Sequence, residues 1–433
     1  MDKLQNLASL ILDEAQALGA QDAQCTVAET QTREFNVDGG EFSLMRTLFD
    51  RSVSITVLKD HRKGSVHINR FDEDAVKAAI RDCIAASDSA EPDEAWEFSH
   101  EACSLSFTDG EPVCDTEALF MRTRELLFQI AERHPKIMVE QMITHHASGH
   151  SVYMNTNGVT YEETEGAYAF SIMYSAHEGE KGSSFFSSEV VVEHLDRPII
   201  DCALIESELS AVEKQIETQS LDGKFVGTAL LAPSALLEIV ISTMIGNFLS
   251  DSSLIEGTSI WKDRLGTQVA DPRFSMSITP DADHVVLREH HTGEGFRSEA
   301  FDLIRDGKLE SFDLSAYGSN KTGFPRAKAS GWNLTVKSGD TALDDLIAGM
   351  DHGILVMRFS GGAPAPSGEF SGVAKNSFLI ENGKLQGALS ETMISGSVPD
   401  MLMNLRGITT EVLQNGSLSV PYMAFDGVTI SGQ

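Results

Sequence analysis

The sequence predicts an α+β protein with an N-terminal α/β region and a C-terminal, mainly antiparallel β domain that carries one long helix. Two observations support this prediction. The order helix, strands, helix occurs twice before residue 220, which suggests a duplication, and short β-type runs between Gly-rich turns dominate after residue 223. We expect an N-terminal domain over 1–220, with a subdivision into 1–90 and 111–220, and a C-terminal domain over 221–433.

The first helix, strands, helix unit covers residues 4–86. Apolar residues at Leu4, Leu7 and Ile11 have helical spacing. The block 24–70 is rich in Thr, Val, Phe and Ile and is broken by turn signals at 38–40 and 61–64, so it predicts strands. Asp72 then predicts the N-cap of a second helix.

The second unit follows an acidic, turn-rich stretch, 87–110, that we interpret as a linker. Helices are expected at both ends of this unit, and its strand-like runs lie between them. The expected segments are a helix over 115–132, strands over 136–144, 151–156 and 167–175, and a helix over 198–219.

The C-terminal half contains one long helical pattern, 233–249. Dipeptides that tolerate positive φ separate most of its β-type runs and predict tight hairpins. These dipeptides are Asp306-Gly307, Asn382-Gly383, Asn415-Gly416 and Asp426-Gly427.

Charge excludes two classes of partner. The chain has 433 residues with 33 Lys+Arg against 65 Asp+Glu, a formal net charge of −32. A surface this acidic repels a phosphate backbone and anionic membranes, so we expect no direct nucleic-acid contact and no membrane contact. No signal peptide and no transmembrane stretch is apparent. Five scattered cysteines without a CxxC pair indicate reduced thiols, and hence a cytoplasmic protein.

Histidine clusters offer one metal hypothesis. His145, His146 and His150 lie close together next to Gly149, in what reads as a hairpin turn that could hold a metal weakly. His290-His291 permits the same interpretation. The His-Glu pairs at His100 and His177 lack the second His of a zinc peptidase helix, so we interpret them as surface residues.

Nucleophile patterns give one incomplete match. Ser259-Ile-Trp-Lys262 has the SxxK form and Lys321-Thr-Gly323 follows it, but the intervening Ser-Asp-Asn element of serine β-lactamases is missing. We interpret these residues as a chance pattern.

A run of small residues extends from Phe359 to Gly372 and includes Gly361 and Gly362. Small residues at strand borders let another backbone approach closely, as a peptide-binding groove requires. A long flexible loop is the alternative, and composition alone favours that alternative.

The C-terminal half resembles the TldD/PmbA family. The resemblance is carried by Gly368-Glu-Phe-Ser-Gly-Val-Ala-Lys-Asn-Ser-Phe-Leu-Ile-Glu-Asn-Gly383, by Ser390-Glu-Thr-Met-Ile-Ser-Gly396 and by Gly427-Val-Thr-Ile-Ser-Gly432. The block from Arg51 to Val57 and the turn Asn155-Thr-Asn-Gly158 also fit. The resemblance implies a cytoplasmic metallopeptidase complex, a dimer that processes peptides, and a historical role as a modulator of DNA gyrase.

In this family one subunit carries zinc on a helical HExxxH and a C-terminal Cys, while its partner is metal-free. By the resemblance, Ile241 and Gly246 stand at the two His positions, Ser242 at the Glu position and Asn415 at the Cys position. None of them supplies an imidazole, a thiolate or a general-base carboxylate. The chain is therefore similar to the metal-free PmbA (TldE) branch, with no catalytic or metal residues of its own.

Three functional hypotheses follow. The first is a non-catalytic subunit that pairs with a zinc-bearing TldD-like homologue and encloses an unfolded peptide, with no cofactor in this chain and zinc in the partner. The second is a stand-alone homodimer that binds peptides without cutting them. The third is a metallopeptidase with an unrecognised metal site. Expected cavity-lining residues are Glu294, Arg297, Tyr317, Asn320, Gly361 and Gly362.

Overall fold

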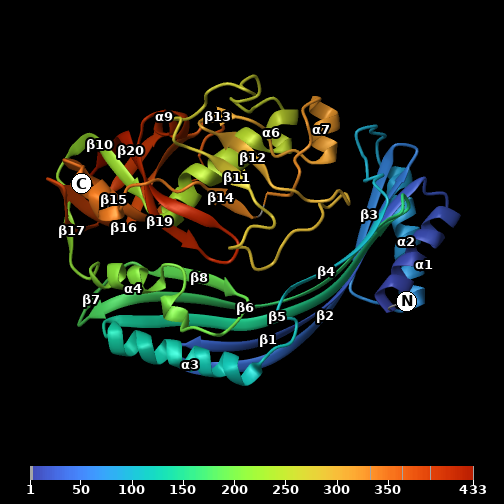
Figure 1. Ribbon diagram of the computed structural model, residues 1–433, viewed down its shortest axis with the longest axis horizontal. Coiled ribbons are helices and arrows are strands. Elements are labelled where there is room, and N and C mark those ends of the chain that lie inside the picture. The colour runs from blue at the N-terminus through green and yellow to red at the C-terminus, as the bar shows by residue number, and fades with distance from the viewer. Residues whose placement is uncertain (1–2, 332, 363, 391, 433) are drawn as a thin grey trace.

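The computed structural model describes residues 3–331, 333–362, 364–390 and 392–432. It confirms the α+β class, and its strands form two large sheets (Figure 1). Strands of the first sheet lie between residues 22 and 192, and those of the second sheet lie between residues 218 and 431. The domain boundary expected at residue 220 stays a prediction.

The first unit has the expected order of elements. Its helices and strands are α1 (Lys3–Ala17), β1 (Asp22–Asp38), β2 (Glu41–Lys59), β3 (Arg62–Ile68) and α2 (Glu73–Ser89). The Asp72 carboxylate accepts a hydrogen bond from the Ala75 amide, which confirms the expected N-cap. Both helices bury an apolar face, for example Ile11 and Ile80, against β1 and β2.

After an additional strand, β4, the second unit repeats the order helix, strands, helix. Its elements are β4 (Cys103–Gly110), α3 (Thr116–Arg133), β5 (Ile137–Asn155), β6 (Val159–Glu178), β7 (Lys181–Gly182), β8 (Phe186–Val192), a 3-10 turn (Ile199–Asp201) and α4 (Ile205–Glu213). Both units contribute to one eight-stranded sheet, because β1 pairs with β5 along most of its length, from Gln24 to Asp38.

The first sheet has the order β3-β2-β1-β5-β6-β4, and β8 also pairs with β6. β2 and β8 therefore lie toward opposite edges of the sheet. Figure 1 shows the C-terminal part above β8 and β4, with β2 on the far side. We call the face that packs against α1, α2 and α3 the helix face of this sheet.

The C-terminal part is mainly antiparallel and surrounds one long helical segment. Its helices are α5 (Pro233–Leu236), continued by two π-helical stretches (Leu237–Ile241 and Met244–Leu249), α6 (Asp251–Ile255), α7 (Ala316–Thr322), α8 (Leu343–Ala348) and α9 (Val398–Met403). Its strands are β9 (Thr218–Ser220), β10 (Lys224–Leu231), β11 (Met276–Ile278), β12 (Phe301–Arg305), β13 (Lys308–Leu309), β14 (Leu334–Val336), β15 (His352–Gly361), β16 (Glu369–Glu381), β17 (Lys384–Ser390), β18 (Met393–Ser397), β19 (Leu405–Gln414) and β20 (Ser419–Ser431).

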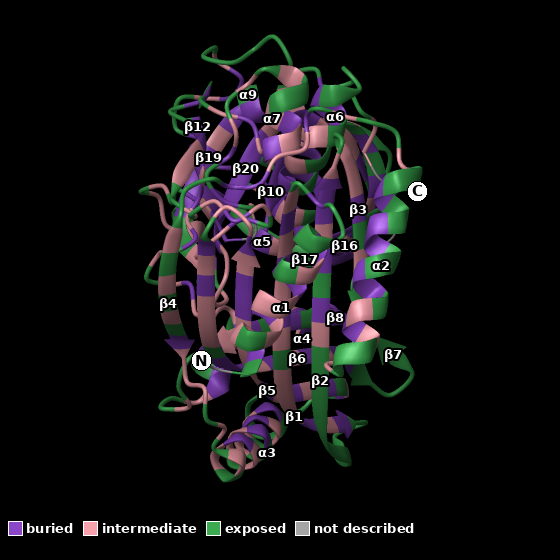
Figure 2. Cartoon of the chain, turned by 90° about the vertical axis from the view of Figure 1, so that its right-hand side faces the viewer, coloured by how far each residue is buried: buried purple, intermediate pink, exposed green. Residues whose placement is uncertain are grey.

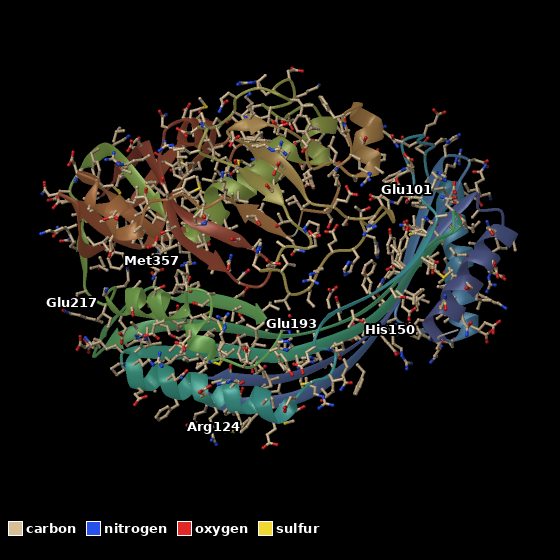
Figure 3. All side chains as sticks on the ribbon, in the orientation of Figure 1. Glu101, Arg124, His150, Glu193, Glu217 and Met357 are labelled. Atoms are coloured by element: carbon tan, nitrogen blue, oxygen red, sulfur yellow. The ribbon has the colours of Figure 1, made fainter. Side chains whose placement is uncertain are left out.

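Two apolar clusters stabilise this arrangement. One fills the C-terminal part around the long helix and includes Phe248 and Phe425. The other joins the two sheets, because Met357 of β15 belongs to the same buried cluster as Leu209 of α4 and Tyr174 of β6 (Figure 3). The two parts of the chain therefore share a continuous core.

Several expected elements have other boundaries. The stretch 87–110 is not only a linker, because Cys103–Gly110 alternates in burial and pairs parallel with β6. The expected strands 136–144 and 151–156 are one strand, β5. The expected helix 198–219 is shorter, since it includes a 3-10 turn and ends before β9.

The hairpin predictions are confirmed where both residues of the dipeptide have positive φ. Asp306-Gly307 joins β12 to β13, and Asn382-Gly383 joins β16 to β17. Asp426-Gly427 instead lies inside β20, where the register with β10 shifts, so it forms a bulge and not a turn. Within the described ranges, no helix is long and apolar enough to cross a membrane.

Candidate functional site

The long helical segment from Pro233 to Leu249 is the one to which the family resemblance assigns the zinc-ligand positions. Pro233 occupies the first turn, where it needs no amide partner, and the helix then winds with π geometry on both sides of Ser242. π-helical stretches are rare and often mark functional positions. The sequence therefore predicts the extent of the helix correctly but not its winding.

The three helix positions of the family site have no metal-binding chemistry here. Ile241 is buried in the C-terminal core. Ser242 is exposed and its hydroxyl donates to the Glu238 carbonyl oxygen at 2.7 Å. Gly246 is exposed, and a Cβ added to it would meet no atom within 4 Å. At these three positions the helix has a buried apolar side chain, a hydroxyl that is hydrogen-bonded to the helix backbone, and a glycine with no side chain.

Asn415, at the expected position of the Cys, is part of the turn between β19 and β20. Its side-chain oxygen accepts hydrogen bonds from the Ser417 and Leu418 amides, at 3.3 and 3.0 Å. Its carbonyl oxygen accepts from the Val191 amide of β8 at 2.8 Å. The Asn415 side chain therefore closes a turn beside the first sheet.

This set of residues does not fit a zinc ion, because isoleucine, glycine and a turn-forming asparagine offer no imidazole or thiolate. Among the residues that the structure describes, no group of three His, Cys, Asp or Glu side chains is placed to hold a metal.

The small-residue run 359–372 lies against this helix. Its two ends belong to the paired strands β15 and β16, where Gly361 lies opposite Gly372, and the described residues between them, 362 and 364–368, lie outside either strand. The Asn247 side-chain amide donates to the Pro364 and Ala365 carbonyl oxygens at 3.3 and 3.1 Å. Pro364 and Ala365 thus contact the helix at Asn247, the residue after Gly246.

The two expected glycines differ in their surroundings. A Cβ at Gly361 would lie 2.5 Å from the Phe359 ring, so the hairpin requires glycine at this position. Gly362 has open space instead, with nothing within 4 Å of a Cβ. Only Gly361 is therefore constrained by packing.

A cavity of about 290 Å³ lies between α6, the start of α7 and the segment 292–294. Two carboxylates, Asp251 and Asp313, line it. Asp251 accepts hydrogen bonds from the amide and hydroxyl of Ser315, at 2.9 and 2.5 Å. Burial raises the pKa of Asp313 to about 7, with further contributions from the charges of Asp251 and Glu289.

Glu294, an expected cavity residue, lines the same cavity together with Arg326. The Glu294 carbonyl oxygen accepts from the Ser99 amide at 2.8 Å, which fixes the segment against the irregular stretch before β4. The Arg326 guanidinium lies 3.9 Å from the centre of the Phe296 ring. The cavity therefore presents both acidic and basic groups to a ligand.

The remaining expected cavity residues lie elsewhere. Arg297 is exposed, in an isolated bridge with His291. Tyr317 donates to Asp93 at 2.9 Å and stacks on Trp96, with ring centres 4.0 Å apart. Asn320 donates to the Ala95 carbonyl oxygen and the Glu97 carboxylate, at 3.1 and 2.8 Å. Tyr317 and Asn320 thus attach the stretch 93–97 to α7.

The histidine cluster is not a turn. His145, His146 and His150 lie inside β5, and His145 points to the opposite face from the other two, since side chains alternate along a strand. His146 and His150 are about 13 Å apart at about 3.3 Å per residue. His146 bonds the Glu111 carbonyl oxygen at 2.7 Å, and His150 bonds Glu162 at 3.2 Å. The hypothesis of a shared metal in a turn is therefore wrong.

His290 and His291 attach the C-terminal part to the first sheet. His290 lies 2.6 Å from the Asp109 carboxylate and stacks on Phe107, with ring centres 3.7 Å apart. His291 stacks on Tyr161 with ring centres 4.6 Å apart. These contacts give both histidines a role at the boundary between the two sheets.

The SxxK pattern is also structural. The Ser259 hydroxyl is buried, donates to the Phe248 carbonyl oxygen at 2.7 Å and accepts from the Trp261 amide at 3.1 Å. Lys321 pairs with Asp93 at 3.0 Å. Ser259 and Lys321, which matched parts of a nucleophile pattern, thus make structural contacts instead.

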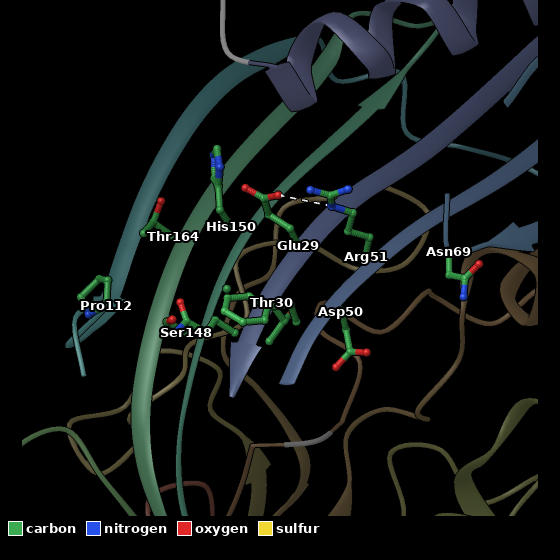
Figure 4. A pocket seen from close by; sticks show the side chains of 12 residues that line it. Glu29, Thr30, Asp50, Arg51, Asn69, Pro112, Ser148, His150 and Thr164 are labelled. Carbon is green, nitrogen blue, oxygen red and sulfur yellow. Dashed lines mark ion pairs between the residues drawn. The ribbon is translucent and has the colours of Figure 1, made fainter. Parts of the chain in front are cut away.

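A larger groove of about 670 Å³ lies on the helix face of the first sheet, below α1 (Figure 4). Its floor includes Glu29, Arg51 and His150, which face the same side from three neighbouring strands. Glu29 and Arg51 are 3.9 Å apart. The groove continues to Phe49 and Asp50 at the β2 edge.

Sequence reasoning missed Asp251, Asp313 and Arg326. One signal was present for Asp313, because a charged residue interrupts the otherwise buried apolar pair Phe312 and Leu314. That alternation is also what an ordinary half-buried extended segment shows, so it did not identify Asp313 as part of a cavity.

Comparison with known proteins supports the family resemblance that those sequence motifs carry. Residues 226–432 match a PmbA/TldA metallopeptidase C-terminal domain, and residues 26–87 match PmbA/TldA metallopeptidase domain 1. A metalloprotease PmbA homologue from Haemophilus influenzae is 24% identical over 406 residues, which cover 88% of this chain and 86% of that protein.

Two crystal structures share the fold over nearly the whole chain. TldE from Thermococcus kodakarensis superposes with a TM-score of 0.83 at 17% identity, covering 100% of both chains. A candidate modulator of a DNA gyrase from Thermotoga maritima superposes with a TM-score of 0.80 at 17% identity, covering 99% of this chain and 100% of that one. With both of its terminal domains matched, the chain belongs to the PmbA/TldD family of metallopeptidases.

Proposed function

We propose that this chain is a non-catalytic, metal-free subunit of a two-component metallopeptidase. It pairs with a zinc-bearing, TldD-like homologue in the cytoplasm and helps to enclose unfolded peptides for hydrolysis. The single observation that carries the proposal is the chemistry of the long helix, where Ile241 is a core residue and Gly246 has no side chain. The likeness of the fold to TldE supports the same branch.

The β15–β16 hairpin is the part of the subunit that we expect to bind a peptide. Pro364 and Ala365, between the two strands, contact Asn247 next to Gly246, and small residues permit a backbone to approach. An extended peptide that adds to such a border would be held by main-chain hydrogen bonds, which suits substrates of varied sequence.

Other features are consistent with a cytoplasmic subunit that acts on peptides. All five cysteines are free thiols, as expected in a reducing compartment. The net charge of −32 opposes direct contact with DNA, so an effect on gyrase would arise through degradation of a peptide that acts on it.

The test compares the chain alone, a zinc-bearing homologue alone and the two mixed. We expect cleavage of an unfolded reporter peptide and stoichiometric zinc, measured by elemental analysis, only when the homologue is present. A chelator should stop the cleavage. Stoichiometric zinc or chelator-sensitive cleavage by this chain alone would contradict the proposal.

A second candidate function is peptide binding without hydrolysis and without a zinc-bearing partner. The cavity that Asp313, Glu294 and Arg326 line favours it, because it offers charged groups to a ligand independently of the helix. Saturable binding of a fluorescent unfolded peptide to the chain alone, combined with no binding to the homologue, would favour this second function.

A further inference from the structure

Two basic side chains lie next to each other on the β15–β16 hairpin. Arg358 of β15 is directly opposite Lys375 of β16 in the antiparallel register, so both project to the same face of the second sheet. Like charges that are directly opposite destabilise a pair of strands. The stability of the hairpin therefore gives no reason for this arrangement. We call Arg358 and Lys375 the cation pair.

Acidic residues do not neutralise the cation pair, although the chain has 65 Asp+Glu against 33 Lys+Arg. Within the described ranges, neither side chain of the pair makes a hydrogen bond or an ion pair. The Nε atom of Arg358 is even buried without a hydrogen-bond partner there. Buried polar groups are normally hydrogen-bonded, so this guanidinium has bonding capacity that the fold does not use.

Glu238 of the long helix lies close enough to Arg358 for their charges to interact. Burial raises the pKa of Glu238, whereas the hydrogen bond from the Phe359 amide and the charge of Arg358 oppose that rise. The Glu238 carboxylate already accepts the hydrogen bond from Phe359, at 2.6 Å. Glu238 and the cation pair together carry a net charge of +1, in a chain of net charge −32. The cation pair is thus a locally positive position beside the long helix.

The stretch between β7 and β8 of the first sheet contacts this position. The Arg358 guanidinium lies 4.3 Å from the centre of the Phe185 ring. The side-chain amide of Asn376, next to Lys375, donates to the Ser184 carbonyl oxygen at 3.2 Å. β7 and the residues that follow it to Phe185 are mostly exposed (Figure 2). The cation pair therefore lies where the two sheets meet, close to solvent.

Asn376 has two features that are unusual inside a strand. Its φ is 48°, which is a left-handed conformation. It is only 3% exposed, and its Oδ1 atom has no hydrogen-bond partner among the described residues. Left-handed backbone in residues other than glycine clusters at functional sites, and unsatisfied buried oxygens are uncommon. These features are a second, separate indication of a binding site beside Lys375.

We propose that Arg358 and Lys375 bind a carboxylate of the peptide that the subunit helps to enclose. This inference rests on the proposed function, because it names the chemical group by which the β15–β16 hairpin holds a peptide. A guanidinium donates two parallel hydrogen bonds to the two oxygens of a carboxylate, and the ammonium of Lys375 adds a further donor. The cation pair is thus matched to a carboxylate in charge and in donors.

The cation pair is within reach of a peptide on the hairpin. Arg358 is three residues from Gly361 along β15, which is about 10 Å at about 3.3 Å per residue. About three residues of an extended peptide therefore span the distance from Gly361 to the cation pair. The carboxylate is the C-terminus of the peptide or an Asp or Glu side chain. Because a basic peptide also ends in a carboxylate, the site does not require an acidic sequence.

The first test uses the native chain in complex with a zinc-bearing homologue, so it does not depend on variants that fold poorly. The substrate is an unfolded, internally quenched fluorescent peptide with one acidic residue, a glutamate. It is made in four forms, with a free or an amidated C-terminus and with glutamate or glutamine. Cleavage is measured at high salt, where the long-range attraction of the acidic chain for positive charge is screened.

We expect loss of the bound carboxylate to raise KM about tenfold or more and to leave kcat unchanged. An effect of amidation alone identifies the C-terminus, and an effect of the glutamine alone identifies the side chain. The net charge of −32 predicts the opposite sign, since a peptide that loses a carboxylate becomes more positive. Equal KM for all four forms overturns the inference.

The second test assigns the effect to the cation pair. Arg358→Gln/Lys375→Gln should raise the KM of the peptide with the bound carboxylate to that of the peptide without it, and Arg358→Lys should give an intermediate value. The matched control is Lys308→Gln/Lys384→Gln, because both lysines are exposed on other strands of the second sheet. A double variant of the cation pair that keeps the native dependence on the carboxylate overturns the inference.

Failure of the inference is distinguishable from failure of the proposed function. If the native complex cleaves the peptide but KM does not depend on the carboxylate, only the inference fails. If the complex neither cleaves the peptide nor binds it in fluorescence anisotropy, the proposed function fails and the inference fails with it.

Discussion

Glu208 allows the energetic cost of a buried carboxylate to be measured in this fold. It lies in α4, is buried, and accepts a hydrogen bond from the Ser188 hydroxyl at 2.5 Å. Ser188 in turn bonds the Tyr174 hydroxyl at 2.9 Å. No ion pair compensates the charge among the described residues, and burial raises the pKa of Glu208 from 4.5 to about 7.

This raised pKa determines how the contribution of Glu208 to the free energy of unfolding changes with pH. The folded protein keeps the proton of Glu208 up to about pH 7, whereas the unfolded chain releases it above pH 4.5. The contribution of Glu208 to stability is therefore most favourable below pH 4.5 and is lost as pH rises toward 7. At 1.36 kcal/mol per pKa unit, the loss is about 3 kcal/mol above pH 7.

Glu208→Gln removes this titration and keeps an acceptor for Ser188. The measured quantity is the free energy of unfolding of the variant minus that of the native chain. We expect this difference to be about 3 kcal/mol larger at pH 8 than at pH 4.5. Urea unfolding followed by fluorescence measures both values. Glu132→Gln is the control, because Glu132 is exposed on α3. Equal differences between variant and native chain at the two pH values would refute the reasoning.

Three further perturbations and one substrate comparison test other contacts. Ser259→Ala should lower the free energy of unfolding by about 1–3 kcal/mol, measured by urea unfolding, because it leaves a buried carbonyl and amide unbonded. Trp96→Ala should speed amide hydrogen exchange in residues 91–97, since it removes the stacking on Tyr317; unchanged exchange would contradict that role. Gly361→Ala should lower the melting temperature through a clash with the Phe359 ring, with a cost of about 1–3 kcal/mol, whereas Gly362→Ala should not. In the complex with a homologue, basic unfolded peptides should be cleaved faster than acidic ones at low salt, and the difference should shrink at high salt; equal rates at low salt would place the excess carboxylates outside the peptide path.

Local signals in the sequence predicted much of the fold. Asp72 caps α2 as its position before an apolar periodic run predicts, and α3 begins within one residue of the expected start of the helix 115–132. Asn382-Gly383 forms its hairpin because both residues adopt the positive φ that such turns require. These predictions succeed because the physical cause lies within a few neighbouring residues.

Predictions failed where distant partners decide the structure. Gly149 suggested a turn, yet it lies in β5 between Thr30 and Glu165 of the flanking strands, and that long-range pairing overrides the local preference for a turn. β4 was hidden in an acidic stretch because its strand state depends on parallel pairing with β6. Asp426-Gly427 forms a bulge because β10 continues opposite it.

In the candidate site, too, the sequence predicts what depends on residue type and misses what depends on contacts between distant residues. The absence of zinc chemistry at Ile241 and Gly246 could be read from residue types alone, given the family resemblance. The carboxylate-lined cavity could not, because Asp251, Asp313 and Arg326 are far apart in sequence and meet only in the folded chain.

The pairing of β1 with β5 also affects how the chain folds during synthesis. The paired residues range from Asp38 with Gln141 to Gln24 with Asn155, so the two members of each pair are more than 100 positions apart in the sequence. At a translation rate of about 5–20 residues per second, β5 leaves the ribosome about 5–20 s after β1. For that interval the side of β1 that pairs with β5 has no strand partner, which leaves it open to pairing with another chain.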